Sequence, residues 1–152
     1  MYSDNIKYIG CDDAGLDLFE SQYALQDGMC YNSFVILDRK VAVMDSSDPR
    51  TSEQWLYNLN AALDGRKPDY IIVQHMEPDH SGSLSAFRKL YPEAVIVASA
   101  KAIAFMQQFD EDMQVEPVLA VKEGDILDLG ERKLQFIAAP MEIGRASCRE
   151  RV

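Results

Sequence analysis

The fold is decided by the stretch Tyr70-Ile71-Ile72-Val73-Gln74-His75-Met76-Glu77-Pro78-Asp79-His80. Its first four residues form an unbroken apolar run, which is typical of a strand that is covered on both faces. The polar residues 74–80 then predict a loop that leaves the end of this strand. Both histidines of the chain lie in this loop, so any function of this sequence that requires an imidazole side chain must involve the loop.

Strands and helices are expected on both sides of this stretch. Upstream, apolar runs at residues 33–37 and 41–45 flank a polar turn and predict a hairpin. Residues 52–63 carry Trp55, Leu59 and Leu63 at helical spacing and predict a core-packing helix, which Thr51 or Ser52 would cap. Downstream, helices are expected at 81–90 and 101–109, and strands at 95–98, 115–121 and 133–138. The first of these helices carries Leu84, Phe87 and Leu90 on one face, and the second contains Ile103, Phe105 and Met106.

Hairpin strands followed by strands that alternate with helices predict an α/β (α+β) fold, in which a mixed sheet has helices on a face. The chain shows no internal repeat and no low-complexity linker.

The loop offers four side chains that can bind metals, namely His75, Glu77, Asp79 and His80. One ion cannot easily take all four, because Asp79 and His80 are displaced along the loop from the first two. Two ions, each with one histidine and one carboxylate, fit the spacing better, and Pro78 would pre-organise the loop.

The type of ligand restricts the metal without choosing it. Imidazole and carboxylate without thiolate suit iron, manganese or zinc. Iron would permit redox chemistry, whereas zinc would indicate hydrolysis. The alternative interpretation is a solvated polar loop in which Asp79 or Ser81 only caps the following helix.

Composition excludes some classes of function. The net charge of −10 argues against a nucleic-acid partner, because phosphate binding needs a basic surface. No apolar run reaches the roughly eighteen residues of a membrane span, and no leader is visible, so a cytoplasmic location without a membrane is expected. The three cysteines include no CxxC pair, which argues against a disulfide framework or a thiolate metal site.

The last eleven residues differ from the rest of the chain. They carry Arg145, Arg149 and Arg151 in a protein that is otherwise acidic. They resemble the translation of a sequencing-adapter oligonucleotide that is read in frame. We therefore expect a domain at residues 1–141 and a non-native tail at 142–152, with a natural basic tail as the alternative.

The segment from His75 to His80, followed by Ser81-Gly82-Ser83, resembles the ligand motif of the flavodiiron proteins (A-type flavoproteins). Residues 17–23, 28–33, 42–45 and 65–70 are also similar to that family, and the resemblance runs from about Ile6 to Met141. Related hydrolases of the same metallo-β-lactamase-like fold typically have a second histidine where this chain has Glu77.

The resemblance implies a non-haem diiron site in which His75 and Glu77 bind the first iron and Asp79 and His80 bind the second. The family completes this site with a later histidine, a bridging aspartate and a final histidine. It also carries a flavodoxin-like domain whose FMN feeds electrons to the irons. None of these parts is in this sequence, which would be about the first half of a four-layer αββα sandwich.

For the parent protein, the resemblance implies an oxygen or nitric oxide reductase with rubredoxin or a related electron donor as partner. It further implies a head-to-tail homodimer. Two other hypotheses stay open. One is a dinuclear zinc hydrolase of the same fold, against which Glu77 counts. The other is that the 152 residues alone form an inert or weakly metal-binding fragment.

Overall fold

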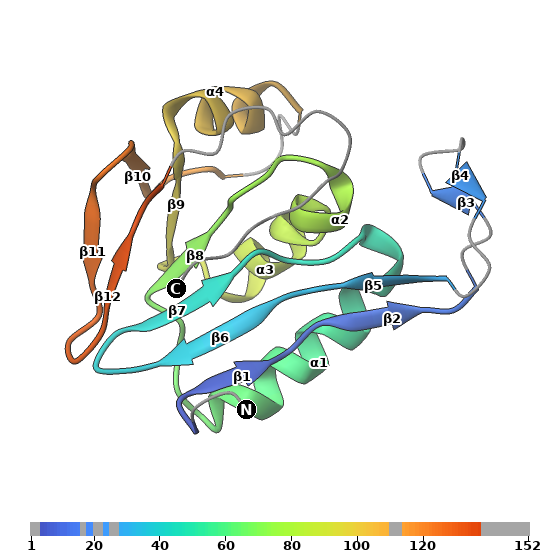
Figure 1. Cartoon of the computed structure of the whole chain (residues 1–152), viewed down its shortest axis with the longest axis horizontal. Helices are drawn as coiled ribbons and strands as arrows, with labels where there is room; N and C mark the ends of the chain where they lie inside the picture. The colour runs from blue at the N-terminus through green and yellow to red at the C-terminus, as the bar shows by residue number, and fades with distance from the viewer. Residues whose placement is uncertain (1–3, 16–17, 20–22, 25–27, 110–113, 138–152) are drawn as a thin grey trace.

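The computed structural model describes residues 4–15, 18–19, 23–24, 28–109 and 114–137 (Figure 1). Residues 142–152, where the foreign tail is predicted, lie outside this described part. The described chain forms a mixed α/β structure around a six-stranded sheet, whose strand order is β1-β6-β7-β8-β9-β10. The strands of this sheet are β1 (Ile6–Tyr8), β6 (Phe34–Leu37), β7 (Val41–Met44), β8 (Tyr70–Ile72), β9 (Val95–Ser99) and β10 (Val118–Val121).

The sheet changes direction at β7. Strands β1, β6 and β7 pair antiparallel, whereas β7, β8, β9 and β10 pair parallel. Each parallel step needs a helical crossover. These crossovers contain η1 (Pro49–Thr51), α1 (Ser52–Leu63), α2 (Pro78–Ser81), α3 (Leu84–Leu90) and α4 (Ala100–Phe109). The predicted mixed sheet and the predicted hairpin of β6 and β7 are confirmed.

Three small pairs complete the described structure. They are β2 (Cys11–Asp13) with β5 (Met29–Tyr31), β3 (Leu18–Phe19) with β4 (Tyr23–Ala24), and β11 (Ile126–Asp128) with β12 (Lys133–Gln135). No strand was expected between the predicted strands at 115–121 and 133–138, so β11 is an element that the sequence analysis missed.

The two faces of the sheet carry separate apolar clusters, because successive side chains of a strand point to opposite faces. The helix-side cluster contains Val43, Ile71 and Ile96 from neighbouring strands. Against them pack Trp55, Leu59, Phe87 and Met106 from α1, α3 and α4.

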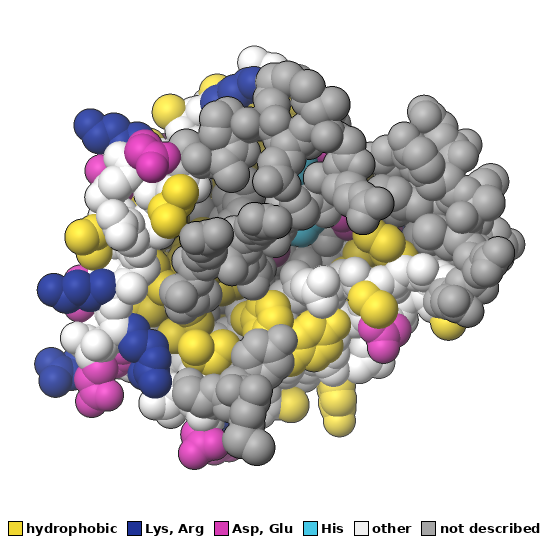
Figure 2. All heavy atoms as spheres, viewed as in Figure 1, with side chains coloured by type: hydrophobic (Ala, Val, Ile, Leu, Met, Phe, Trp, Pro, Cys, Tyr) yellow, Lys and Arg dark blue, Asp and Glu magenta, His cyan; other side chains and the backbone are white. Residues whose placement is uncertain are grey.

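The opposite face is partly covered by the β11–β12 hairpin. Its Leu127 and Leu134 pack with Met44, Ile72 and Val97, the next residues along the same three strands. Figure 2 shows apolar side chains gathered over β6 and β7 on this face. Strand β8 is therefore covered on both sides, as its unbroken apolar sequence predicts.

The helix predicted at 81–90 is shorter, and a separate one-turn helix, α2, precedes it. Pro78 starts α2, because its fixed φ suits the first turn of a helix, so Asp79 and His80 lie in a one-turn helix instead of a loop. Helix α3 starts only at Leu84. Leu90 and Phe105 are 59% and 41% exposed, so the apolar residues that the sequence places on these two helices are not all buried.

Within the described ranges, no helix is both long enough and apolar enough to cross a lipid bilayer.

Candidate metal centre

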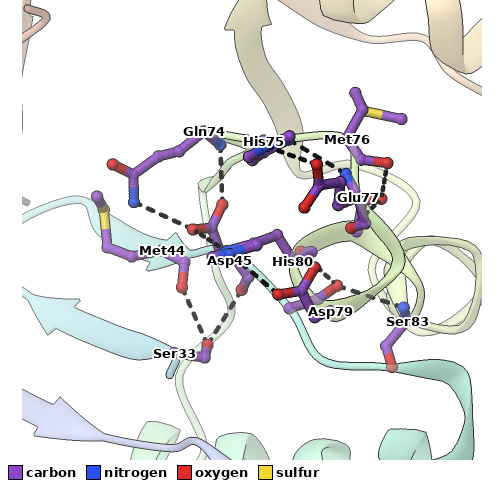
Figure 3. A network of polar contacts seen from close by, with 12 residues as sticks. Ser33, Met44, Asp45, Gln74, His75, Met76, Glu77, Asp79, His80 and Ser83 are labelled. Atoms are coloured by element: carbon purple, nitrogen blue, oxygen red, sulfur yellow. Dashed lines mark hydrogen bonds and ion pairs between the residues drawn. The ribbon is translucent and has the colours of Figure 1, made fainter. Parts of the chain in front are cut away.

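The carboxyl ends of β7 and β8 carry the candidate centre. These strands are parallel neighbours, with Met44 paired to Ile72, so the residues that follow them meet at one edge of the sheet. Asp45 follows β7, and its N–H donates to Ile72 O at 2.8 Å. The segment from Gln74 to His80 follows β8 and closes over Asp45 (Figure 3).

The four predicted ligands lie close together, as two pairs. His75 Nε2 lies 3.3 Å from Glu77 Oε1, and His80 Nε2 lies 3.4 Å from Asp79 Oδ2. The two imidazoles are stacked, with ring centroids 5.7 Å apart and planes 13° apart. Among the described residues, no three histidine, cysteine, aspartate or glutamate side chains converge as a ready metal cage. The assignment of these four residues as metal ligands stays a prediction.

The two pairs differ in exposure. The side chains of His80 and Asp79 are 14% and 8% exposed, whereas those of His75 and Glu77 are 42% and 39% exposed. Asp79 Oδ1 is buried and accepts no hydrogen bond from the described residues. A buried carboxylate oxygen in this state costs free energy.

Asp45 is the residue of the candidate centre that the sequence analysis missed. Its side chain is fully buried. Its Oδ1 accepts from Gln74 N at 2.8 Å, and its Oδ2 accepts from Gln74 Nε2 at 3.2 Å and lies 3.0 Å from His80 Nδ1. Its φ of 55° lies in the left-handed region, which aspartate tolerates better than most residues.

Asp45 determines which nitrogen of His80 presents a lone pair. An ionised carboxylate only accepts hydrogen bonds, so Nδ1 of His80 carries the hydrogen of this contact. In the neutral ring, Nε2 then points its lone pair toward Asp79. A carboxylate behind a histidine in this way is the usual outer partner of a metal-binding imidazole. The signal in the sequence was an aspartate that directly follows an apolar strand next to the histidine-bearing strand.

Backbone and hydroxyl contacts hold α2 on the loop after β7. The N–H and the Oγ of Ser46 donate to His80 O at 2.7 and 2.9 Å. Ser83 N donates to Ser46 Oγ at 3.3 Å. A Cβ on Gly82 would lie 2.3 Å from Pro49 Cδ, so only glycine permits this close approach. Hydrogen bonds to both the ring and the backbone carbonyl of His80 therefore fix its position.

The core supports Asp45 from behind. The Trp55 Nε1–H donates to Ser33 Oγ at 3.0 Å, and Ser33 Oγ donates to Asp45 O at 3.0 Å. Trp55 is completely buried, so the expectation that it packs in the core is confirmed. The centre thus rests on α1 and on Ser33, the residue before β6, as well as on β7 and β8.

Tyr31 belongs to a neighbouring polar network. Its buried hydroxyl accepts from Arg50 Nη2 at 3.0 Å and donates to Asp13 Oδ2 at 3.4 Å. Burial raises the pKa of Tyr31, although the hydrogen bond from Arg50 opposes this effect. These contacts fix the β2–β5 ribbon to η1.

The donor set fits divalent metal ions. In the neutral ring, His80 Nε2 and Asp79 Oδ2 are two electron-pair donors that face each other, and Asp79 Oδ1 is buried without a protein partner among the described residues. Histidine nitrogen with carboxylate oxygen suits iron, manganese and zinc.

The mixed sheet and the His-x-Glu-x-Asp-His segment after its strand β8 agree with a metallo-β-lactamase-like protein, the class that the family match gives. Residues 29–142 match the family described as ODP family beta lactamase. The chain is 39% identical, over 137 residues, to diflavin flavoprotein A 1 of Synechocystis sp., an alignment that covers 90% of this chain and 24% of that protein. It is 34% identical to the anaerobic nitric oxide reductase flavorubredoxin of Vibrio vulnificus, over 90% of this chain and 28% of that protein.

Solved structures agree with these relatives. The rubredoxin oxygen:oxidoreductase of Desulfovibrio gigas superposes with a TM-score of 0.78 at 27% identity, covering 88% of this chain and 33% of that one. The chain belongs to the flavodiiron protein family and contains its metallo-β-lactamase-like domain fold. It spans about a quarter of the length of the curated relatives named above.

Proposed function

We propose that this chain supplies four ligands of a non-haem diiron centre in a flavodiiron oxygen or nitric oxide reductase. The observation that carries the proposal is the pairing of His75 with Glu77 and of Asp79 with His80 at the edge of the sheet. The buried carboxylate of Asp45 behind His80 supports it.

The residues of the chain have distinct parts in this proposal. His75 and Glu77 would hold one iron, and Asp79 and His80 the other. Iron bound there would supply the change of oxidation state that the reduction of oxygen or nitric oxide requires. Asp45 keeps the hydrogen of His80 on Nδ1 and thereby presents Nε2. Ser46 holds the backbone of His80 in place.

Electron supply and assembly are proposed from the family. The names of two relatives contain flavorubredoxin and rubredoxin, which supports FMN as the electron carrier to the irons and a rubredoxin-type donor. A head-to-tail homodimer and a cytoplasmic location belong to the same proposal for the parent protein.

We also propose that the native part of this sequence runs to about residue 141 and that residues 142–152 are foreign. The family match ends at residue 142, which supports this boundary. Long-read sequencing across codon 141 tests it. A frame that continues into a histidine, an aspartate and a flavodoxin-like segment would agree, whereas a confirmed stop after Val152 would refute it.

The function is tested on the whole parent protein, purified without oxygen. We expect bound iron, together with consumption of oxygen or nitric oxide when the flavin is reduced. Glu77→Gln should reduce both the iron content and the consumption, whereas the exposed control Glu53→Gln on α1 should change neither. Zinc in place of iron, with chelator-sensitive hydrolysis of an ester or thioester, would replace this proposal with the zinc hydrolase.

A further inference from the structure

The two halves of the metal motif are not equally prepared to take an ion. The Asp79–His80 half is buried, and the His75–Glu77 half is about 40% exposed. Water competes more strongly for exposed donors, and electrostatic attraction to an ion is weaker in a high dielectric. Burial alone therefore favours the Asp79–His80 half.

The hydrogen bonds of the two imidazoles differ in the same direction. Nδ1 of His80 faces Asp45, so the neutral ring already points the lone pair of Nε2 toward Asp79 Oδ2. Nδ1 of His75 instead accepts from Glu77 N at 3.3 Å. This contact places the ring hydrogen of His75 on Nε2, the nitrogen that faces Glu77 Oε1. An ion that binds His75 must first displace one of these two interactions.

The carboxylates differ as well. Asp79 Oδ1 is buried without a hydrogen-bond partner among the described residues, so an ion there would remove an existing cost. Glu77 has a side chain that is 39% exposed, and water already solvates part of it.

We propose that the two positions load in a fixed order, with the Asp79–His80 position first and the His75–Glu77 position second. This inference rests on the proposed function, because it assumes that these four residues bind metal. Outer partners such as Asp45 typically change metal affinity about 10–100-fold. The first step should therefore be at least about tenfold tighter than the second.

The first test uses the unmodified chain, labelled with ¹⁵N and titrated with Zn²⁺. Zinc is diamagnetic, and the chain has two histidines, so two imidazole spin systems report the order directly. The Nε2 resonance of His80 should move during the first equivalent, and a His75 nitrogen only during the second. His75→Gln assigns the signals. Movement of both rings together, or of His75 first, would overturn the order.

A matched pair of variants provides the second test by calorimetry with Zn²⁺. Glu77→Gln should leave the tighter step nearly unchanged, whereas Asp79→Asn should weaken it at least about tenfold. Equal losses in both variants would refute the inference. Thermal melts show whether each variant folds, and the titration of the unmodified chain does not depend on either one. Absence of any zinc binding would refute the proposed metal site itself, a result distinct from binding in the wrong order.

Discussion

Replacing Asp45 with asparagine should move the ring hydrogen of His80 from Nδ1 to Nε2, the nitrogen that would bind a metal ion. The change keeps the size of the side chain, and asparagine tolerates the φ of 55° at this position. The amide has one acceptor and one donor group where aspartate has two acceptors. If its oxygen keeps the bond from Gln74 N, its NH₂ faces His80 Nδ1. His80 then accepts at Nδ1 and carries its hydrogen on Nε2.

The expected magnitude follows from these contacts. Loss of the outer partner of a metal-binding histidine costs about 10–100-fold in affinity, which is about 1.4–2.8 kcal/mol. The fold should lose less, about 1 kcal/mol, because a charged hydrogen bond is replaced by a neutral one. In a domain of this size, that loss lowers the Tm by roughly 3 °C.

Two measurements separate these effects. Calorimetry with Zn²⁺ gives the affinity of the tighter step, and imidazole ¹⁵N shifts of the metal-free chain give the tautomer of His80. Asp64→Asn is the matched control, because Asp64 also has a positive φ, of 49°, but lies exposed after α1. An Asp45→Asn protein with unchanged affinity and an unchanged tautomer would refute the positioning role of Asp45.

Three further predictions concern stability. Arg88 is buried, its pKa is lowered by that burial, and it donates to five backbone carbonyls, those of Pro92, Ala94, Gln114, Val115 and Pro117. Arg88→Met should therefore cost about 3 kcal/mol or more in chemical denaturation, whereas Lys89→Met, at an exposed position, should cost little; equal costs would contradict this. Gly82→Ala should cost about 1–3 kcal/mol, because its Cβ would meet Pro49 Cδ and Pro78 O, and should also weaken zinc binding; a fully stable variant would disprove the close packing. Desolvation raises the pKa of Asp38, but N–H donors from Glu131, Arg39 and Arg132 outweigh it and hold the pKa below the ordinary value of an aspartate. The stability from these bonds is present above that ordinary pKa and is lost as the pH falls through the lowered pKa, so Asp38→Asn should flatten the acid side of the stability–pH curve; an unchanged curve would contradict this.

Local sequence patterns were sufficient for much of the fold. The apolar run before Gln74 predicted a strand that is covered on both faces. Its successive residues Ile71 and Ile72 do pack into the two separate clusters on opposite faces of the sheet. The spacing of Trp55, Leu59 and Leu63 predicted α1, and all three are buried. These features depend on residues that are close in the sequence.

The errors in the fold have local causes as well. Pro78 can start a helix as readily as it can stiffen a loop, so the sequence did not distinguish α2 from a loop. Phe105 has the helical spacing of a core residue but is 41% exposed, because periodicity does not show how wide the covered face of a helix is.

One residue of the candidate centre, Asp45, was outside the reach of sequence spacing. Four side chains, those of His75, Glu77, Asp79 and His80, were predicted as ligands because they lie in one short segment. Asp45 lies 35 residues before His80, and only the parallel pairing of β7 with β8 brings the two together. The unequal burial of the two pairs likewise depends on tertiary packing.

The most direct test of the account is the iron content of the chain after anaerobic loading with Fe²⁺ and desalting. We expect iron to remain bound in the unmodified chain, to persist at a lower level in His75→Gln, and to be lost in His80→Gln, with similar thermal melts for all three proteins. Equal iron in all three proteins, or none in the unmodified chain, would contradict the proposal that the segment from His75 to His80 forms part of a diiron centre.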